Sequence, residues 1–206
     1  MNACSRILDR DHSLTAFEGP RPDRAEAEAA FRTIIRWAGD DSARDGLVET
    51  PARAARAFEE FFAGYAQDPA TLLRTTFEEI EGYDESVALR GIPFESHCEH
   101  HLAPIIGKAW VVYVPNGRVV GISKLARVVE CYARRLQVQE RMTAQIANTI
   151  DDVLRPRGVG VIIKATHHCM TTRGVHKPGT DLMTTRTLGC FRDDPALRQE
   201  FMRMAD

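Results

Sequence analysis

The interval between apolar residues changes near residue 75, and this change constrains the fold more than any other feature of the chain. Before it, apolar residues recur at the interval of an amphipathic helix. This spacing predicts one helix over 23–39, which Gly39 ends, and a second over 50–65, with Thr50 as N-cap and Pro51 at the first helical position. The expected buried faces comprise Ala27, Phe31, Ile34, Ile35 and Ala38 in the first helix and Ala54, Ala57, Phe58, Phe61 and Phe62 in the second.

After residue 75 the pattern alternates between strands and helices. The expected elements, in chain order, are strands over 86–90, 105–114 and 118–122, helices over 123–135 and 138–154, strands over 159–166 and 182–190, and a last helix that begins at Asp194-Pro195. The turn Pro115-Asn116-Gly117 predicts a hairpin between the second and third strands, and Ser123 is the expected cap of the helix that follows. This order of elements after a helical start predicts an α+β fold with an antiparallel sheet.

Length and charge narrow the class of protein. The chain has 206 residues, which suits one domain or one domain with an appendage. Lys and Arg number 27 and Asp and Glu 29, so the net charge of −2 argues against a sequence-independent binder of nucleic acid or membranes. No apolar run approaches the roughly 18 residues of a membrane span, and the first residues contain no signal-peptide core, so we expect a cytoplasmic protein. We expect a flexible arm over 1–22, a helical region over 23–75 and the main domain over 76–206.

Cysteine and histidine cluster in two segments. The 5 cysteines are too scattered for a disulfide framework in a reducing compartment, so those beside histidine are candidate metal ligands. In HCEHH at 97–101, Cys98 and His101 form a C-x-x-H pair that can reach one ion from a tight loop. This pair supplies only two ligands, so the rest of the metal site is expected from ATHHC at 165–169, at the end of a strand. Alternation along the strand places His167 and Cys169 on one face and His168 on the other.

The two segments predict Zn²⁺ held by Cys98, His101 and Cys169, because two thiolates balance the charge of the ion and suit its softness. Three protein ligands leave a fourth position for water, as in catalytic zinc sites. A structural site stays open as an alternative, with a fourth ligand from His97, His167 or His168. The remaining cysteines are expected elsewhere, Cys131 and Cys190 as buried small apolar side chains and Cys4 in the arm.

Further polar residues surround these segments in the sequence. His100 and His167 are candidates for proton transfer or for a supporting hydrogen bond, because imidazole titrates near neutrality. The junction GISKLAR at 121–127 joins a strand to a helix N-terminus, which favours an anion near Lys124 and Arg127. Arg173 would add a third cation near the metal, whereas the exposed Arg53 is equally consistent with a solvated charge. The chain has no P-loop motif.

The helix at 138–154 begins with a glutamine and a carboxylate. Glu140 has the position of a partner for the helix dipole. If it faces a pocket, it can accept hydrogen bonds from the N1–H and the exocyclic amine of guanine, and adenine offers no such pair of donors.

Three segments, CEHH, GKAWVVYVPNGRVVGISKLARVVECYARRLQVQER and HHCMTTRGVHK, resemble GTP cyclohydrolase I, and the similarity runs from 49–58 to 188–195. The resemblance implies a tunnelling fold and a ring-stacked homo-oligomer, commonly a decamer, with active sites between subunits. It matches the zinc ligands Cys98, His101 and Cys169 and the proton-transfer histidines His100 and His167. It also implies a triphosphate site formed by Ser123, Lys124, Arg127 and Arg173, with Arg53 from a neighbouring subunit, and a guanine site formed by Gln139 and Glu140.

The reaction implied by this resemblance is a hydrolysis at a cyclic amidine C–N bond. GTP and water give formate and 7,8-dihydroneopterin triphosphate, the first step towards tetrahydrofolate and other pterins, after zinc-activated water attacks C8 of the purine. No nicotinamide, flavin or ATP is required. His97 stands where an apolar or small residue is expected, which suggests an additional ligand or an altered pKa at that position.

Two other classes of protein compete with this interpretation. Related tunnelling-fold enzymes include pterin synthases, which hold zinc with three histidines, and a deazaguanine reductase, which uses a nucleophilic cysteine and nicotinamide. The ligand set of Cys98, His101 and Cys169 matches neither. A binding module with structural zinc would be favoured by substitution of His100 or His167, and both histidines are present.

Overall fold

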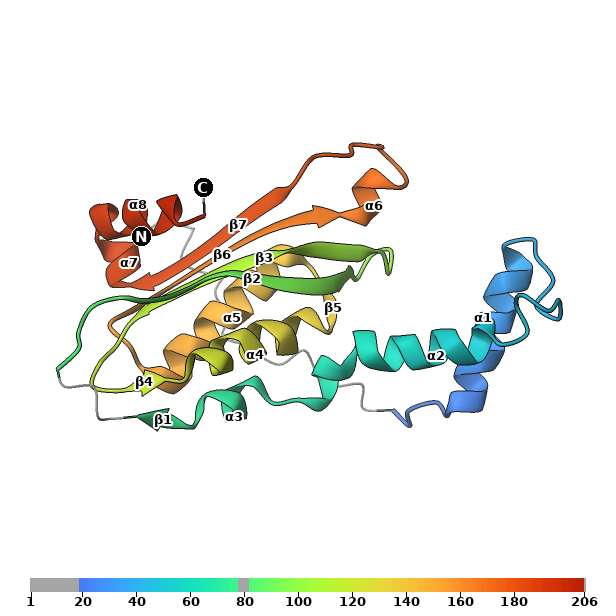
Figure 1. Cartoon of the computed structure of the whole chain (residues 1–206), viewed down its shortest axis with the longest axis horizontal. Helices are drawn as coiled ribbons and strands as arrows, with labels where there is room; N and C mark the ends of the chain where they lie inside the picture. Colours follow the sequence, from blue (N-terminus) through green and yellow to red (C-terminus); the bar gives the residue numbers. More distant parts are fainter. Residues whose placement is uncertain (1–18, 78–81, 206) are drawn as a thin grey trace. The chain divides into compact units, whose positions relative to one another are not determined.

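The computed structural model describes residues 19–77 and 82–205 (Figure 1). These residues form two compact units, one that ends at Glu59 and one that begins at Glu60. Most of the expected arm, including Cys4, lies outside the described residues, and the domain limits expected at 22 and 75 stay predictions. None of the helices in the described ranges is long and apolar enough to cross a membrane.

The first unit contains α1 (Arg24–Trp37) and most of α2 (Thr50–Phe61). Asp23 caps α1 by accepting a hydrogen bond from the Glu26 N–H, and Gly39 follows the helix with a positive φ of 98°, as its expected terminator. Phe31 packs edge-on against Phe58 with ring centroids 5.0 Å apart. Ile34, expected to be buried, is 55% exposed, because periodicity identifies an apolar face but not what covers it.

Two boundaries of the expected second helix differ from the structure. The N–H of Arg53 donates to the Glu49 carbonyl, so α2 begins at Thr50 itself rather than after a Thr50 cap. The helix ends at Phe61, and the next turn is a separate 3₁₀ helix, η2 (Ala63–Ala66). The short helix α3 (Pro69–Leu73) follows, capped by Asp68, and then strand β1 (Thr76–Phe77).

The second unit is built on a five-stranded sheet with the order β5-β2-β3-β6-β7. Its strands are β2 (Val87–Cys98), β3 (Pro104–Val114), β5 (Leu136–Gln137), β6 (Gly158–His167) and β7 (Leu182–Gly189). Neighbouring strands are antiparallel, except that β5 is parallel to β2. The strands expected over 105–114, 159–166 and 182–190 are confirmed within two residues at each end. The strand expected over 86–90 continues to Cys98, past a register shift between Leu89 and Ile92.

The hairpin expected after residue 114 is wrong. Strand β4 (Val119–Val120) pairs with β1 rather than with β3. Both edges of β3 are already occupied, since Tyr113 pairs with Val87 on one side and with Val159 on the other. The Tyr113 hydroxyl instead accepts a hydrogen bond from the Val120 N–H at 3.1 Å.

Helices α4 (Ile122–Ala133) and α5 (Gln139–Leu154) cover one face of the sheet, and α7 (Cys190–Asp193) and α8 (Pro195–Arg203) lie on the other face (Figure 1). Side chains of β3 alternate between the two faces of the sheet and contribute to the core on each face. Val111 packs in the core with α4 and α5, and Val112 packs with Phe191 and Phe201. The α+β architecture is therefore confirmed. Asp194 caps α8 as expected, but the cap position of α4 is Gly121, without a side-chain hydrogen bond, and Ser123 lies inside the first turn.

Gly64 allows η2 to approach α4 closely, and this contact gives a stability prediction. Its N–H donates to the Arg134 carbonyl, and a Cβ at this position would lie 2.1 Å from the Cys131 carbonyl oxygen. Gly64→Ala is therefore expected to destabilise the fold by about 1–3 kcal/mol or more, measured as a lower midpoint of urea unfolding. Gly46→Ala, whose Cβ would meet only the flexible end of Arg44, is the control, and equal midpoints for the two variants would contradict this account.

Candidate active site

A tight loop between β2 and β3 positions the first two candidate ligands. The Cys98 N–H donates to the Ala103 carbonyl and the Leu102 N–H donates to the Cys98 carbonyl, both at 2.8 Å. Leu102 closes the turn with a positive φ of 54°. Cys98 and His101 consequently project together, with 3.8 Å between Cys98 Sγ and His101 Nδ1.

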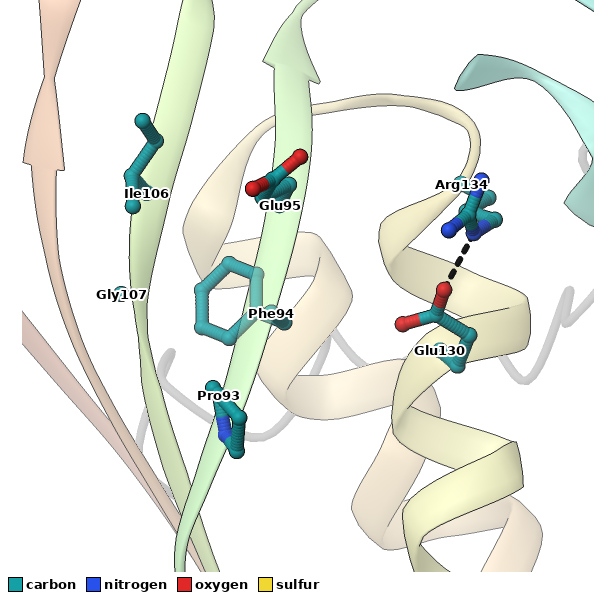
Figure 2. Close-up of a pocket in the computed structure, with 7 residues that line it drawn as sticks. All are labelled: Pro93, Phe94, Glu95, Ile106, Gly107, Glu130 and Arg134. Carbon is teal, nitrogen blue, oxygen red and sulfur yellow. Dashed lines mark hydrogen bonds and ion pairs between the residues drawn. The ribbon is translucent and has the colours of Figure 1, made fainter. Parts of the chain in front are cut away.

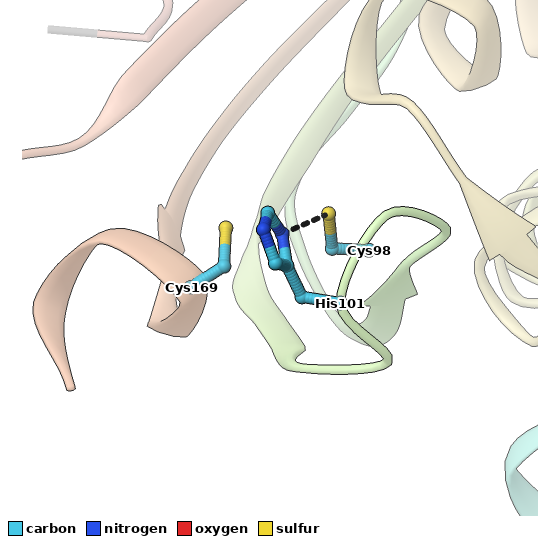
Figure 3. Close-up of side chains that lie close together, drawn as sticks. All are labelled: Cys98, His101 and Cys169. Atoms are coloured by element: carbon cyan, nitrogen blue, oxygen red, sulfur yellow. Dashed lines mark hydrogen bonds between the residues drawn. The ribbon is translucent and has the colours of Figure 1, made fainter. Parts of the chain in front are cut away.

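The third candidate comes from α6 (His168–Thr171), the short helix that follows β6. Because His167 pairs with Ile105 at the start of β3, this helix begins beside the loop. The ligand atoms of Cys98, His101 and Cys169 all lie within 4.8 Å of one another (Figure 3). The expected group of three side chains is present. Cys169 reaches it from α6 rather than by alternation along β6, because the helix begins at His168.

The geometry and electrostatics of this group fit a metal cation. A tetrahedral ion bound at the usual Zn–S and Zn–N lengths would separate its ligand atoms by about 3.5–3.8 Å. Cys98 Sγ and His101 Nδ1 are 3.8 Å apart, and no two of the three ligand atoms are more than 4.8 Å apart. Burial raises the pKa of the Cys169 thiol, and the neighbouring Cys98 raises it further. The Cys169 thiol therefore resists ionisation unless a cation compensates its charge. No other histidine of the described residues belongs to this group.

His97 has a structural environment instead. Its ring lies 4.6 Å from the Phe61 ring and 5.3 Å from the Phe62 ring, centroid to centroid. Burial lowers the pKa of His97, which keeps the ring neutral and apolar in its contacts. The unusual histidine before Cys98 thus packs against aromatic rings rather than joining the metal ligands.

His100 is exposed within the metal loop, the segment 99–103 that connects β2 to β3. Its Nδ1 lies 3.8 Å from Cys98 Sγ, and its Nε2 lies 3.8 Å from a carboxylate oxygen of Glu99. Glu99 also forms an ion pair with Arg141 on α5, and Arg141 donates to the Leu136 carbonyl at 3.3 Å. The pair ties the metal loop to α5. Sequence reasoning missed it, although both residues lie within the segments CEHH and QVQER.

The ion pair between Glu99 and Arg141 predicts a loss of metal affinity on substitution. Arg141→Ala removes the contact that holds the loop, and we expect metal to bind about 10–100-fold more weakly, measured by competition with a chelator. Arg32→Ala, which removes an exposed ion pair with Glu28 on α1, is the matched control. If both variants compete with the chelator as the wild type does, the loop does not depend on Arg141.

His167 lies at the end of β6, opposite the start of α5. Its Nε2 is 2.8 Å from Oε1 of Gln139, which is buried. Burial lowers the pKa of His167, and the negative charge of Glu140 acts in the opposite direction. Glu140 is exposed, and no hydrogen bond or ion pair between described residues occupies its carboxylate. Arg173 follows α6 close enough to lower the pKa of Cys169 by its charge.

The residues expected to hold a triphosphate are not all at this end of the sheet. Ser123, Lys124 and Arg127 lie in the first turns of α4, which leads from β4 back towards β5 (Figure 1). The far end of α4 adjoins the metal loop, because β5 pairs with Cys98. At 1.5 Å per residue this helix is about 18 Å long, so its N-terminus lies far from the metal group. Arg53 is exposed on α2 in the first unit.

A pocket of about 330 Å³ lies elsewhere, between β2, β3 and α4 (Figure 2). Arg134 and Glu130 form an ion pair at its wall. Its lining residues are Pro93, Phe94, Glu95, Ile106, Gly107, Glu130 and Arg134. None of the expected site residues lines it.

Fold and site together define an α+β protein with a Cys–His–Cys group at one end of its sheet. The family described as GTP cyclohydrolase I matches residues 27–206. A GTP cyclohydrolase 1 from Maricaulis maris (strain MCS10) is 55% identical over 193 residues, which cover 94% of each chain. The crystal structure of an archaeosine synthase QueF-Like in the apo form aligns with 50% of this chain and 93% of its own, at 20% identity and a TM-score of 0.43. The chain therefore belongs to the GTP cyclohydrolase I family.

Proposed function

We propose that this chain opens the imidazole ring of GTP by hydrolysis, releases formate and forms 7,8-dihydroneopterin triphosphate at a zinc site made by Cys98, His101 and Cys169. The observation that carries the proposal is the convergence of three ligand atoms within 4.8 Å, with His100 beside Cys98. The family match over residues 27–206 supports the reaction.

Zinc is the cation that this donor set suits best, since two thiolates and an imidazole match its preference for sulfur and nitrogen ligands. Held by three protein ligands, it supplies Lewis-acid activation of water for attack on an electrophilic carbon such as C8 of guanine. Thiolate ligands require a reducing compartment, and we propose that the protein works in the cytoplasm.

His100 and His167 are the proposed proton-transfer residues. His100 lies beside Cys98 and is exposed, so a substrate at the metal can reach it. His167 is half-buried and has a lowered pKa, so it is neutral and able to accept a proton near pH 7. Opening the ring and releasing formate both require proton movement. His100 lies in the loop that supplies His101, and His167 ends the strand that leads to Cys169.

Glu140 is the proposed guanine contact, because its exposed carboxylate can accept from both N1–H and the exocyclic amine. Glu140→Ala is expected to lower kcat/KM for GTP by about 100-fold. Inosine triphosphate lacks the exocyclic amine, so the wild type should discriminate against it and the variant much less. Equal discrimination by both proteins would remove Glu140 from base recognition.

The separation between the N-terminus of α4 and the metal group supports a shared site. Ser123, Lys124 and Arg127 lie about one helix length from the metal end of their own chain. We propose that in a homo-oligomer, a decamer by family resemblance, the α4 N-terminus and Arg53 of neighbouring copies complete the triphosphate site around Arg173. The main domain over 76–206 would then be catalytic only when assembled.

The proposal is tested by incubating the purified, zinc-loaded protein with GTP. After oxidation, fluorescent neopterin is measured, and formate is assayed in parallel. Both products are expected in equal amounts. Formate without a pterin would mean that ring closure fails and that the proton-transfer roles need revision. Neither product from a zinc-loaded oligomer would contradict the proposed reaction and leave a binding role.

A further inference from the structure

Gln139, the first residue of α5, makes a set of hydrogen bonds that determines which way its amide faces. Its Nε2 donates to the backbone carbonyls of Ile163 at 3.2 Å and Leu182 at 2.9 Å. Carbonyl oxygens only accept hydrogen bonds, so the amide nitrogen must face β6 and β7. The opposite orientation would place the amide oxygen against two carbonyl oxygens in a fully buried position.

Two threonine hydroxyls agree with this orientation. Thr143 donates its only hydroxyl hydrogen to the Gln139 backbone carbonyl at 2.8 Å. In the 2.7 Å contact between Thr143 and Thr184, the hydrogen must therefore come from Thr184. Thr184 Oγ1 is left as an acceptor, and Gln139 Nε2 donates to it at 3.1 Å. Gln139 Nε2 carries two hydrogens for three acceptors, so one hydrogen is shared between two oxygens, and every donor of the network still faces an acceptor.

The fixed amide determines the proton position on His167. With Nε2 of Gln139 facing the strands, its Oε1 faces His167 Nε2 at 2.8 Å. An amide oxygen only accepts, so His167 Nε2 must carry a hydrogen. In the neutral ring the lone pair then lies on Nδ1.

We propose that Gln139 is a positioning residue for His167, which holds the ring in place and keeps its hydrogen on Nε2, so that the lone pair of the neutral ring is on Nδ1. The proposal rests on the proton-transfer role proposed above for His167. The positioning role replaces the guanine contact expected for Gln139, because the amide N–H groups of Gln139 already have acceptors in the protein. Recognition of the base is left to Glu140.

The hydrogen position can be read directly from protein labelled with ¹⁵N-histidine. Protonated and unprotonated ring nitrogens have well separated ¹⁵N shifts and couple differently to the two ring C–H protons. The spectrum of the zinc-loaded oligomer is recorded above the ordinary imidazole pKa of about 6.5, and a His167→Asn spectrum assigns the signal. The expected result is a hydrogen on Nε2. A hydrogen on Nδ1 in the wild type would overturn the proposal, whether or not any variant folds.

Gln139→Met keeps the length of the side chain but removes every hydrogen bond of the amide. We expect a mixture of the two His167 tautomers and a kcat about 10–100-fold lower, with KM for GTP within about threefold of the wild type. Gln145→Met is the matched control, since Gln145 is buried on the same helix and accepts from Gln137 rather than contacting a histidine. This control should lower thermal stability without changing the tautomer or kcat.

The outcomes separate the two roles of Gln139. A higher KM with unchanged kcat and an unchanged His167 spectrum would mean that Gln139 contacts guanine, and the proposal would be wrong. If the wild type formed no product from GTP, the reaction proposed above would fail, while the wild-type spectrum would still decide whether the glutamine fixes the ring proton.

Discussion

Cys169→Ala is expected to lose both the bound metal and the formation of product from GTP. The substitution removes one of three ligand atoms that lie within 4.8 Å of one another. Two protein ligands do not hold zinc against competition, and without the cation no group in the site activates water. Turnover should fall by about 1,000-fold or more, and metal content should fall from about one ion per subunit to near zero. Metal content is measured by elemental analysis of the purified protein, and product by neopterin fluorescence.

Cys190→Ala is the control for this prediction. Cys190 is half-buried at the start of α7, and burial raises the pKa of its thiol, but it does not belong to the metal group. The variant should keep its metal and nearly all of its activity. Full metal content in Cys169→Ala, or the same loss in both variants, would mean that the ligand set is assigned wrongly.

His167→Ala is expected to keep the metal and lose about 100- to 10,000-fold in kcat, the usual range for a proton-transfer residue. His167 lies outside the three-ligand group, so elemental analysis should still find about one zinc per subunit. The neighbouring histidine is the control, because His168→Ala changes the same short segment without removing the contact to Gln139. Kinetics with GTP for the two variants provide the measurement.

Loss of zinc from His167→Ala would identify His167 as a ligand and favour a closed, structural site. Equal activity in His167→Ala and His168→Ala would remove His167 from the proton-transfer step. The two results differ in their metal content, so they cannot be confused.

Much of the second unit could be predicted from sequence, because its strands and helices have clear periods. The apolar residues of β3 and β6 predict strands over 105–114 and 159–166, and Asp194-Pro195 predicts the start of α8. The sequence predicts too short a strand for β2, because Gly91 and Pro93 interrupt its apolar alternation. The folded strand accommodates both residues at or near a register shift. Local pattern does not show that β3 has both edges occupied, which is why the hairpin was wrong.

The ligands were easier to predict than the contacts that support them. Cysteine and histidine are so restricted in chemistry that two short segments suffice to suggest Cys98, His101 and Cys169. Gln139 and His167 are 28 positions apart, and Arg141 and Glu99 are 42 apart. Nothing in either local sequence indicates the pairing, since these contacts depend on where β6, the metal loop and the start of α5 meet in the folded sheet.

The most direct test of the account is a zinc titration of the metal-free oligomer, with turnover of GTP measured at each step. The account predicts that activity rises in proportion to bound zinc and reaches its maximum at about one ion per subunit, the capacity of a single Cys–His–Cys group. Full turnover in the metal-free protein, or zinc bound at this stoichiometry without any turnover, would contradict it.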